Sequence, residues 1–190
     1  MPDQAEGEVT TQESWACVRL VPEGTAEVVW GKRIDPARIC IMNVTLPDSD
    51  RLYGDIILND GAPEGTRISR GEEFPVFNEL KVWKRSDYST YHVEVTGATA
   101  ESKSNLESFC NEAGLHFEDW GTIRRLCAAC SRGNPGAHDC VSDSDAEFAT
   151  RFGIAARTFE SAAKLLVDWR ELEPDISCSF LELVLCGVSQ

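Results

Sequence analysis

The sequence predicts an α+β protein: an N-terminal antiparallel β unit, built like a barrel or sandwich, followed by a three-helix unit packed on it. Short runs rich in Val, Ile, Tyr and Trp fill residues 14–97 and are separated by turn sequences. After residue 97 the apolar residues recur at helical spacing. Strands followed by helices, without alternation of the two, are typical of this class. Residues 1–13 are expected to be flexible, and residues 98–190 form the helical unit, which contains a Cys/His cluster.

Six strands are expected in the β unit, because six short β-rich runs alternate with turn sequences. Pro, Gly, Asp or Asn gather at 22–25, 47–50 and 59–65, between these runs. Pro75 lies inside one run and indicates an edge strand or a bulge at that point. Short strands at this spacing favour a small antiparallel barrel or sandwich. The expected strands are 15–21, 26–30, 38–46, 54–58, 74–84 and 88–96.

Capping residues and an apolar stripe define the first two expected helices. The first covers 105–113, because Ser104 and Glu107 fit a capping box and Gly114 fits a helix stop. The second covers 117–131, where apolar residues recur every three or four positions. Its stripe consists of Phe117, Trp120, Ile123 and Cys127.

The third expected helix has the clearest periodicity. A second capping box begins at Ser144, and the helix closes before Pro174. Between them apolar residues recur in steps of four and three, which predicts a helix that packs closely on a neighbour. That face consists of Phe148, Phe152, Ala155, Phe159, Ala162, Leu166 and Trp169. The last apolar run, 176–188, fits either a final strand or a buried helix.

Composition and charge argue against several classes of protein. The chain has 190 residues and a formal net charge of −14. Acidic residues outnumber basic ones in both halves, 17 against 10 in residues 1–100 and 15 against 8 in residues 101–190. Because Lys and Arg supply most of the affinity for phosphate backbones, no nucleic-acid partner is expected. No apolar run is long enough to cross a membrane, and the N-terminus lacks a signal-peptide pattern, so a cytoplasmic protein without a membrane partner is expected.

The densest cluster of potential metal ligands lies between residues 127 and 140. Three thiols and one imidazole are the ligand set of a closed, tetrahedral zinc site. The first two share a face of the expected helix, and the last two are spaced so that an extended segment points both side chains the same way. A loop containing Gly and Pro lies between the two pairs and can reverse the chain. The predicted zinc ligands are Cys127, Cys130, His138 and Cys140.

Two other interpretations of this cluster stay open. In the first, Cys127 and Cys130 belong to the core stripe of the expected helix, and His138 and Cys140 are loop residues. In the second, the Cys-Ala-Ala-Cys pair carries out redox chemistry. The helix dipole argues against the second, because the pair lies near the expected C-terminal end of its helix, where the dipole raises a thiol pKa.

The other chemically competent residues have structural interpretations. The chain has no motif for phosphate binding, acyl transfer or zinc-protease chemistry, so no catalytic or cofactor-binding residue is predicted. His92 is expected on the polar face of a strand, and His116 in a turn between two helices. Four thiols lie singly in apolar runs and are expected to be small buried residues: Cys17, Cys40, Cys178 and Cys186.

Two functions follow from these patterns. The first is a non-enzymatic interaction or regulatory protein that binds a protein partner and is stabilised by a structural zinc ion. It rests on the lack of catalytic motifs and on the acidic surface, which would attract a basic partner. The alternative is a metal- or thiol-dependent redox enzyme that uses the 127–140 cluster. The sequence leaves the oligomeric state open.

Residues 15–96 also carry a pattern of short motifs. It runs Glu27-Val-Val-Trp30, then Asn43 with Pro47, then Gly54-Asp-Ile-Ile57, and ends with Val82 and Ser86-Asp-Tyr-Ser-Thr90. This pattern resembles a family of bacterial β-rich domains of unknown function. The resemblance implies a β-rich fold for the first half of the chain. It implies no activity and no catalytic residues, and it does not reach residues 97–190.

Overall fold

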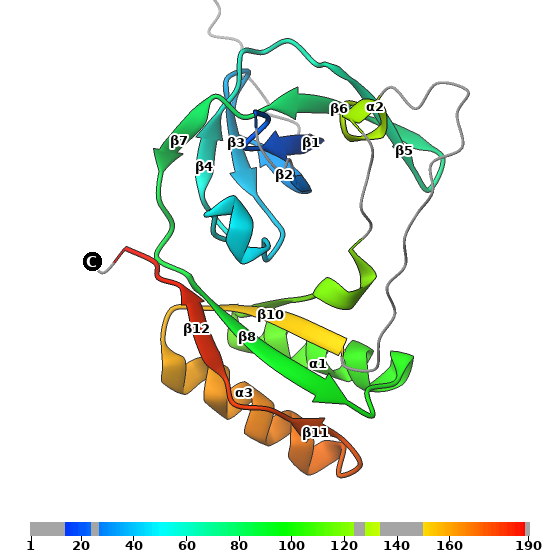
Figure 1. Ribbon diagram of the computed structural model, residues 1–190, viewed down its shortest axis with the longest axis vertical. Coiled ribbons are helices and arrows are strands. Elements are labelled where there is room, and N and C mark those ends of the chain that lie inside the picture. The colour runs from blue at the N-terminus through cyan, green and yellow to red at the C-terminus, as the bar shows by residue number, and fades with distance from the viewer. Residues whose placement is uncertain (1–13, 24–26, 124–127, 134–149, 189–190) are drawn as a thin grey trace, which may run out of the picture.

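Strands in two sheets and three α-helices make up the part of the chain that the structure, a computed structural model, describes (Figure 1). That part consists of residues 14–23, 27–123, 128–133 and 150–188. The mixed α+β class expected from the sequence is therefore confirmed. No helix in these ranges is long and apolar enough to cross a membrane.

The first sheet is strongly curved but open (Figure 1). Its strands are β1 (Trp15–Leu20), β2 (Glu27–Arg33), β3 (Arg38–Ile41), β4 (Ile56–Leu58), β5 (Gly65–Ser69), β6 (Glu72–Asn78) and β7 (Lys81–Lys84). They follow the order β5-β6-β1-β2-β3-β4-β7, and every pair is antiparallel except β1 with β6. Among the described residues no pairing joins β5 to β7, so the closed barrel that the sequence also allowed is not formed there.

Pro75 lies in β6 just before the point where the pairing of β6 with β1 begins. The run expected as one strand at 74–84 is two strands, β6 and β7, separated by Glu79 and Leu80. On its β1 side, β6 pairs only from Val76 onward, so Pro75 lies just beyond that ladder. A proline is tolerated at this position because its missing N–H would have had no strand partner on that side.

The interior of the first sheet is filled by side chains from neighbouring strands. Val18 and Phe77 stand opposite each other where β1 and β6 run parallel, and both are buried. The cluster consists of Ala16, Val18, Leu20, Val29, Ile39, Ile41, Ile57 and Phe77. Together these apolar groups give the first sheet a core of its own.

The second sheet has helices on one face. Its strands are β8 (Ser89–Thr96), β9 (His116–Asp119), β10 (Thr150–Ala156), β11 (Ser177–Cys178) and β12 (Glu182–Leu185). The helices on that face are α1 (Ala100–Ala113) and α3 (Phe159–Leu172), whereas the short α2 (Ala128–Ser131) lies beside the first sheet (Figure 1). The order β11-β8-β10-β9, with β12 also on β8, is antiparallel throughout. The succession β8-α1-β9-β10-α3-β11/β12 is the split β-α-β arrangement of ferredoxin-like folds.

Capping residues set the ends of α1 and α3. The Thr99 side chain accepts from the Ser102 backbone N–H, and the Ser102 hydroxyl lies 2.8 Å from the Thr99 backbone nitrogen, which completes a capping box. α1 therefore starts before the expected 105–113 but ends as expected at Gly114, whose φ of 65° lies in the left-handed region. Thr158 caps α3 in the same way as Thr99 caps α1, by accepting from Ser161.

The helix expected at 117–131 is wrong for residues 117–123. Residues 116–119 form β9, and a 3₁₀ turn at Trp120–Thr122 follows it. The carboxylate of Asp119 accepts from the Gly121 N–H and starts this turn. Phe117 packs on Phe152 from the neighbouring strand, with ring centroids 5.4 Å apart. The place of Phe117 in an apolar stripe thus reflects packing in a sheet. Among the described residues of the expected helix, 128–131 form an α-helix.

The long helix expected from the seam at Phe148 is also wrong in its first half. Residues 150–156 form β10, and α3 begins only at Phe159. β10 lies between β8 and β9, and its last five residues are buried. A strand that is buried on both faces has apolar residues at consecutive positions. Because apolar and polar residues do not alternate in such a strand, its sequence cannot be distinguished from that of a buried helix. The run at 176–188, left open between strand and helix, contains β11 and β12.

The chain passes from the first sheet to the second between β7 and β8, ahead of the division expected at residue 97 (Figure 1). Strand β8 therefore pairs only with strands of the second sheet. Its Tyr91, Val93 and Val95 side chains pack with α1 and α3 in the core of the second unit. A separate buried cluster joins the two sheets and consists of Val44, Tyr53, Tyr88, Trp120 and Ala155.

Candidate functional site

The predicted zinc site falls mostly outside the described residues. Cys127, His138 and Cys140 lie in ranges that the structure does not describe, whereas Cys130 is half-buried in α2. Within the described part of the chain, no group of three or more His, Cys, Asp or Glu is placed to hold a metal ion. The four-ligand site therefore stays a prediction.

The segment that carries Cys130 docks on the first sheet. The carbonyl of Gly133 accepts from the backbone N–H of Thr66 in β5, at 3.2 Å. Gly133 has a φ of 77°, and a Cβ atom there would lie 2.6 Å from the backbone of Thr66. Only glycine fits this close approach without strain. The segment that contains Cys130 is thus held beside β5, an outer strand of the first sheet.

The buried thiols have environments unsuited to nucleophilic chemistry. Burial raises the pKa of Cys17, Cys40 and Cys178, and it raises the pKa of Cys110 to about 12. A reactive cysteine needs the opposite shift, because the thiolate is the nucleophile. Cys17 is buried and Cys40 and Cys178 are half-buried, as small apolar residues would be, but Cys186 is exposed, so the expectation of burial is wrong for it.

Asn43 and Glu118 link the two sheets. The Asn43 side chain accepts from the Trp30 backbone N–H at 2.6 Å, and its amide donates to the Glu118 carboxylate at 2.8 Å. Glu118 also makes a hydrogen bond with the backbone of Val44. Burial raises the pKa of Glu118 despite these partners. The sequence analysis assigned no role to either residue, because they lie 75 positions apart and only the fold brings them together.

Glu27 is a second carboxyl group near this link. Both of its oxygens accept from the Leu46 N–H, at 3.1 and 3.2 Å. Burial, helped by the negative charges of Glu118 and Asp48, raises the pKa of Glu27 to about 7, against the hydrogen bonds from Leu46 and Ser49, which lower it. The interface between the sheets therefore holds a carboxyl group that titrates near neutral pH.

An aromatic group forms the other part of the interface. The His116 imidazole stacks on Tyr53, with ring centroids 3.7 Å apart, and Tyr88 packs edge-on against Tyr53. The Arg157 guanidinium lies 4.1 Å from the centre of the Tyr88 ring and donates to the Asp87 carboxylate at 2.7 Å. Burial, with a further contribution from Arg157, lowers the pKa of His116, which favours a neutral imidazole. His116 is therefore a packing residue of a strand, not of the expected turn.

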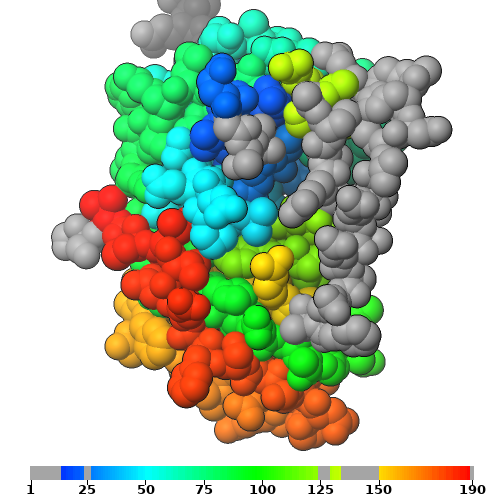
Figure 2. Space-filling model, viewed as in Figure 1, coloured from blue at the N-terminus to red at the C-terminus, as the bar shows by residue number. Residues whose placement is uncertain are grey.

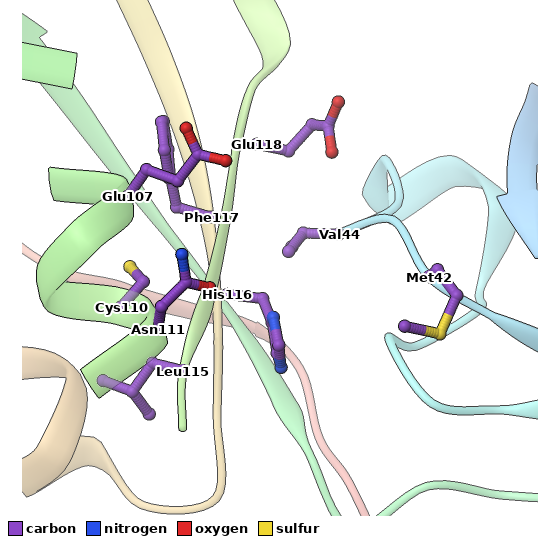
Figure 3. Close-up of a pocket in the computed structure, with 9 residues that line it drawn as sticks. All are labelled: Met42, Val44, Glu107, Cys110, Asn111, Leu115, His116, Phe117 and Glu118. Carbon is purple, nitrogen blue, oxygen red and sulfur yellow. The ribbon is translucent and has the colours of Figure 1, made fainter. Parts of the chain in front are cut away.

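A pocket of about 220 Å³ opens beside this interface (Figure 3). Figure 3 shows Met42 and Val44 facing α1 and β9 across it. Two features limit its chemistry: the Glu118 carboxylate is held by Asn43, and the Cys110 thiol stays protonated because burial raises its pKa to about 12. The pocket is lined by Met42, Val44, Glu107, Cys110, Asn111, Leu115, His116, Phe117 and Glu118.

Exposed apolar side chains lie within and beside the outer strand of the second sheet, spread along its length. Phe180, in the turn before β12, is 94% exposed, and Leu183 within β12 is 50% exposed. Phe159 at the start of α3 and Val188 after β12 are about as exposed as Leu183. The name C-terminal edge is used below for strand β12 together with these four exposed apolar residues: Phe159, Phe180, Leu183 and Val188. Figure 2 shows the C-terminal segment lying on the surface and crossing from the second unit to the first.

Comparison with known proteins gives no information on the function of this chain. No protein-family model and no curated protein matches the chain. A solved structure titled "Novel crystal structure of a hypothetical protein from Neisseria gonorrhoeae" is similar over 93% of this chain and 97% of that one, with 12% sequence identity and a TM-score of 0.39. A likeness at this TM-score carries no argument. The resemblance of residues 15–96 to a bacterial β-rich family stays a prediction.

Proposed function

We propose that the chain is a non-enzymatic, cytoplasmic interaction protein that binds a protein partner through its C-terminal edge. The observation that supports this most is the exposure of Phe180, at 94% of its surface. Single exposed apolar residues are ordinary, but several of them within and beside one outer strand are typical of a binding surface. Five described cysteines form no disulfide, which fits a reducing compartment: Cys17, Cys40, Cys110, Cys178 and Cys186.

A docking strand would meet few obstacles at this edge. Strand β12 pairs with β8 on one side, and among the described residues no strand pairs with its other side. An extended peptide can add to such an edge, where main-chain hydrogen bonds provide affinity and side-chain contacts provide specificity. Aromatic and aliphatic side chains beside the edge would supply the apolar contacts, because large apolar groups dominate the energy of interfaces.

Loss of the apolar side chains should abolish binding. We expect the tagged wild-type chain, isolated from its native cells, to carry a stoichiometric protein partner, and the double variant Phe180→Asp/Leu183→Asp to lose it. The purified partner should then bind the wild-type chain and bind the double variant at least about a hundredfold more weakly in calorimetry. Ile68→Asp is a matched control, because Ile68 is an apolar residue that is 74% exposed on β5, an outer strand of the first sheet, whereas the C-terminal edge belongs to the second sheet. Equal binding by all three proteins would contradict the proposal.

A structural zinc ion at Cys127, Cys130, His138 and Cys140 is the second part of the proposal. Its support is the ligand set and the position of Cys130 on a segment held against β5. Protein purified without a polyhistidine tag should contain about one equivalent of zinc, and a chelator should lower its melting temperature. Cys127→Ser should have the same effect without chelator. Less than about a tenth of an equivalent of zinc, with no change on chelation, would rule the site out.

A further inference from the structure

We propose that strand β9 and the turn after it form a proton-sensitive joint between the two sheets, which loosens as pH rises through neutrality while both sheets stay folded. The proposal concerns contacts inside the molecule and does not depend on binding at the C-terminal edge. It combines the row of contacts that β9 makes with the first sheet, the carboxyl groups placed there, and the separate cores of the two sheets.

Three alternate residues at the edge of the second sheet carry the joint. His116 stacks on an aromatic ring of the first sheet with centroids 3.7 Å apart, and Glu118 accepts from a side-chain amide at 2.8 Å. Trp120 donates its indole N–H to a backbone carbonyl at 2.9 Å. Their partners all lie in the segment between β3 and β4 and are, in the same order, Tyr53, Asn43 and Val44. Because alternate side chains of a strand point to one face, β9 turns a single row of side chains to the first sheet.

Each sheet has an apolar core that does not include this row. The core of the first sheet and the core between the second sheet and its helices are separate clusters, and Trp120 belongs to a third, smaller cluster at the joint. Proteins open locally at a lower free energy than global unfolding requires. The joint can therefore open while the two cores remain intact.

The carboxyl groups at the joint have no cationic partner. Among the described residues neither Glu118 nor Glu27 forms an ion pair, and the negative charge of Glu118 acts on Glu27 from across the joint. The other charged groups that face these two are also acidic: Glu107 of α1, which lines the pocket with Glu118, Asp48 of the 3₁₀ turn Pro47–Ser49, and Asp119 of β9, which Lys103 of α1 neutralises at 2.6 Å. Ionisation of Glu118 and Glu27 therefore places two like charges at the joint without compensation.

The sign of the pH dependence follows from these surroundings. Burial raises the pKa of both carboxyl groups from an ordinary value of 4.5, and it brings that of Glu27 to about 7. The joined state therefore keeps protons that a separated state loses. The stabilisation of the joint by these groups is fully present below about pH 4.5 and is lost as pH rises through about 7.

His116 acts in the opposite direction at lower pH. Burial, with a further contribution from Arg157, lowers the pKa of His116 from its ordinary value of 6.5. Arg157 itself donates to Asp87 at 2.7 Å. The stabilisation from a neutral His116 is present above pH 6.5 and is lost as pH falls through the lowered pKa. Above pH 6.5 the carboxyl groups alone therefore control the joint.

Hydrogen exchange of the Trp120 indole N–H, followed by NMR, tests the proposal. This proton is held by Val44 and exchanges only when the joint opens. Glu27→Gln/Glu118→Gln keeps acceptor oxygens for the same partners but removes both charges. At pH 8 the indole of this variant should exchange at least about tenfold more slowly than that of the wild type, and the ratio should fall toward one at pH 5. In the wild type alone, protection of the indole should fall by at least about threefold between pH 6.5 and 8.5.

Two comparisons separate the joint from other causes. Glu72→Gln/Glu112→Gln removes two exposed carboxylates, one from β6 and one from α1, so it has the same net charge as the test variant. It should leave the exchange of the indole unchanged. In the wild type at pH 8 the indole should be at least about tenfold less protected than the slowest amides of β1 and β8, because the joint opens without unfolding. Equal exchange in the wild type and the test variant, an equal effect of the control variant, or an indole as protected as those amides would each overturn the proposal.

Discussion

Replacing Gly153 with alanine is expected to lower the free energy of unfolding by about 3 kcal/mol, measured by urea titration. The Trp120 indole lies across Gly153, and a Cβ atom at position 153 would meet the indole at 2.3 Å. The same indole stacks on His92 and donates to the Val44 carbonyl of the first unit at 2.9 Å. A methyl group would displace it, so the variant would lose both the close packing and a buried hydrogen bond between the units.

A double-mutant cycle separates this contact from a general intolerance of β10. Trp120→Leu removes most of the ring that the new methyl group would meet. In that background Gly153→Ala should cost less than about 1 kcal/mol, because the clash has gone. If the cost of Gly153→Ala is the same with and without the Trp120 ring, the contact with Trp120 is not its cause.

Parts of the fold could be predicted because local chemistry determines them. Gly114 ends α1 as expected, since a left-handed residue after a helix favours glycine. Strands β1 to β4 were expected near their observed positions, because alternating runs and turns are local signals, whereas β5 was not expected and β6 and β7 were expected as one strand. The helix expected through Phe152 failed because β10 is buried on both faces, and a fully apolar run has the same appearance in a helix and in a strand.

The interface between the sheets could not be predicted in the same way. Asn43 follows β3, and Glu118 was expected inside a helix, so nothing in either local sequence indicates their hydrogen bond. The raised pKa of Glu27 has the same origin, since burial by distant segments causes it. The C-terminal edge could not be predicted for another reason: 176–188 is almost wholly apolar, so nothing in its sequence distinguishes the exposed Phe180 from the buried Ile176.

Glu27 should make the stability of the protein fall as pH rises. Its pKa is about 7 in the folded protein against an ordinary value of 4.5, so between these pH values the folded state keeps a proton that the unfolded state loses. The stabilisation from this group is fully present below about pH 4.5 and is lost as pH rises through about 7. The difference corresponds to about 3 kcal/mol at most. Glu118 contributes in the same direction, because burial raises its pKa too.

Glu27→Gln should therefore flatten this pH dependence. The amide oxygen can still accept from the Leu46 N–H, but the side chain no longer ionises inside the interface. Urea unfolding should show the variant to be more stable than the wild type by about 2 kcal/mol at pH 8 and nearly equal to it at pH 5. Glu72→Gln is the matched control, because Glu72 is exposed on β6 and its loss changes the net charge by the same amount. Were Glu72→Gln to flatten the profile as much as Glu27→Gln, relief of the overall negative charge would be the cause, and burial of Glu27 would not be.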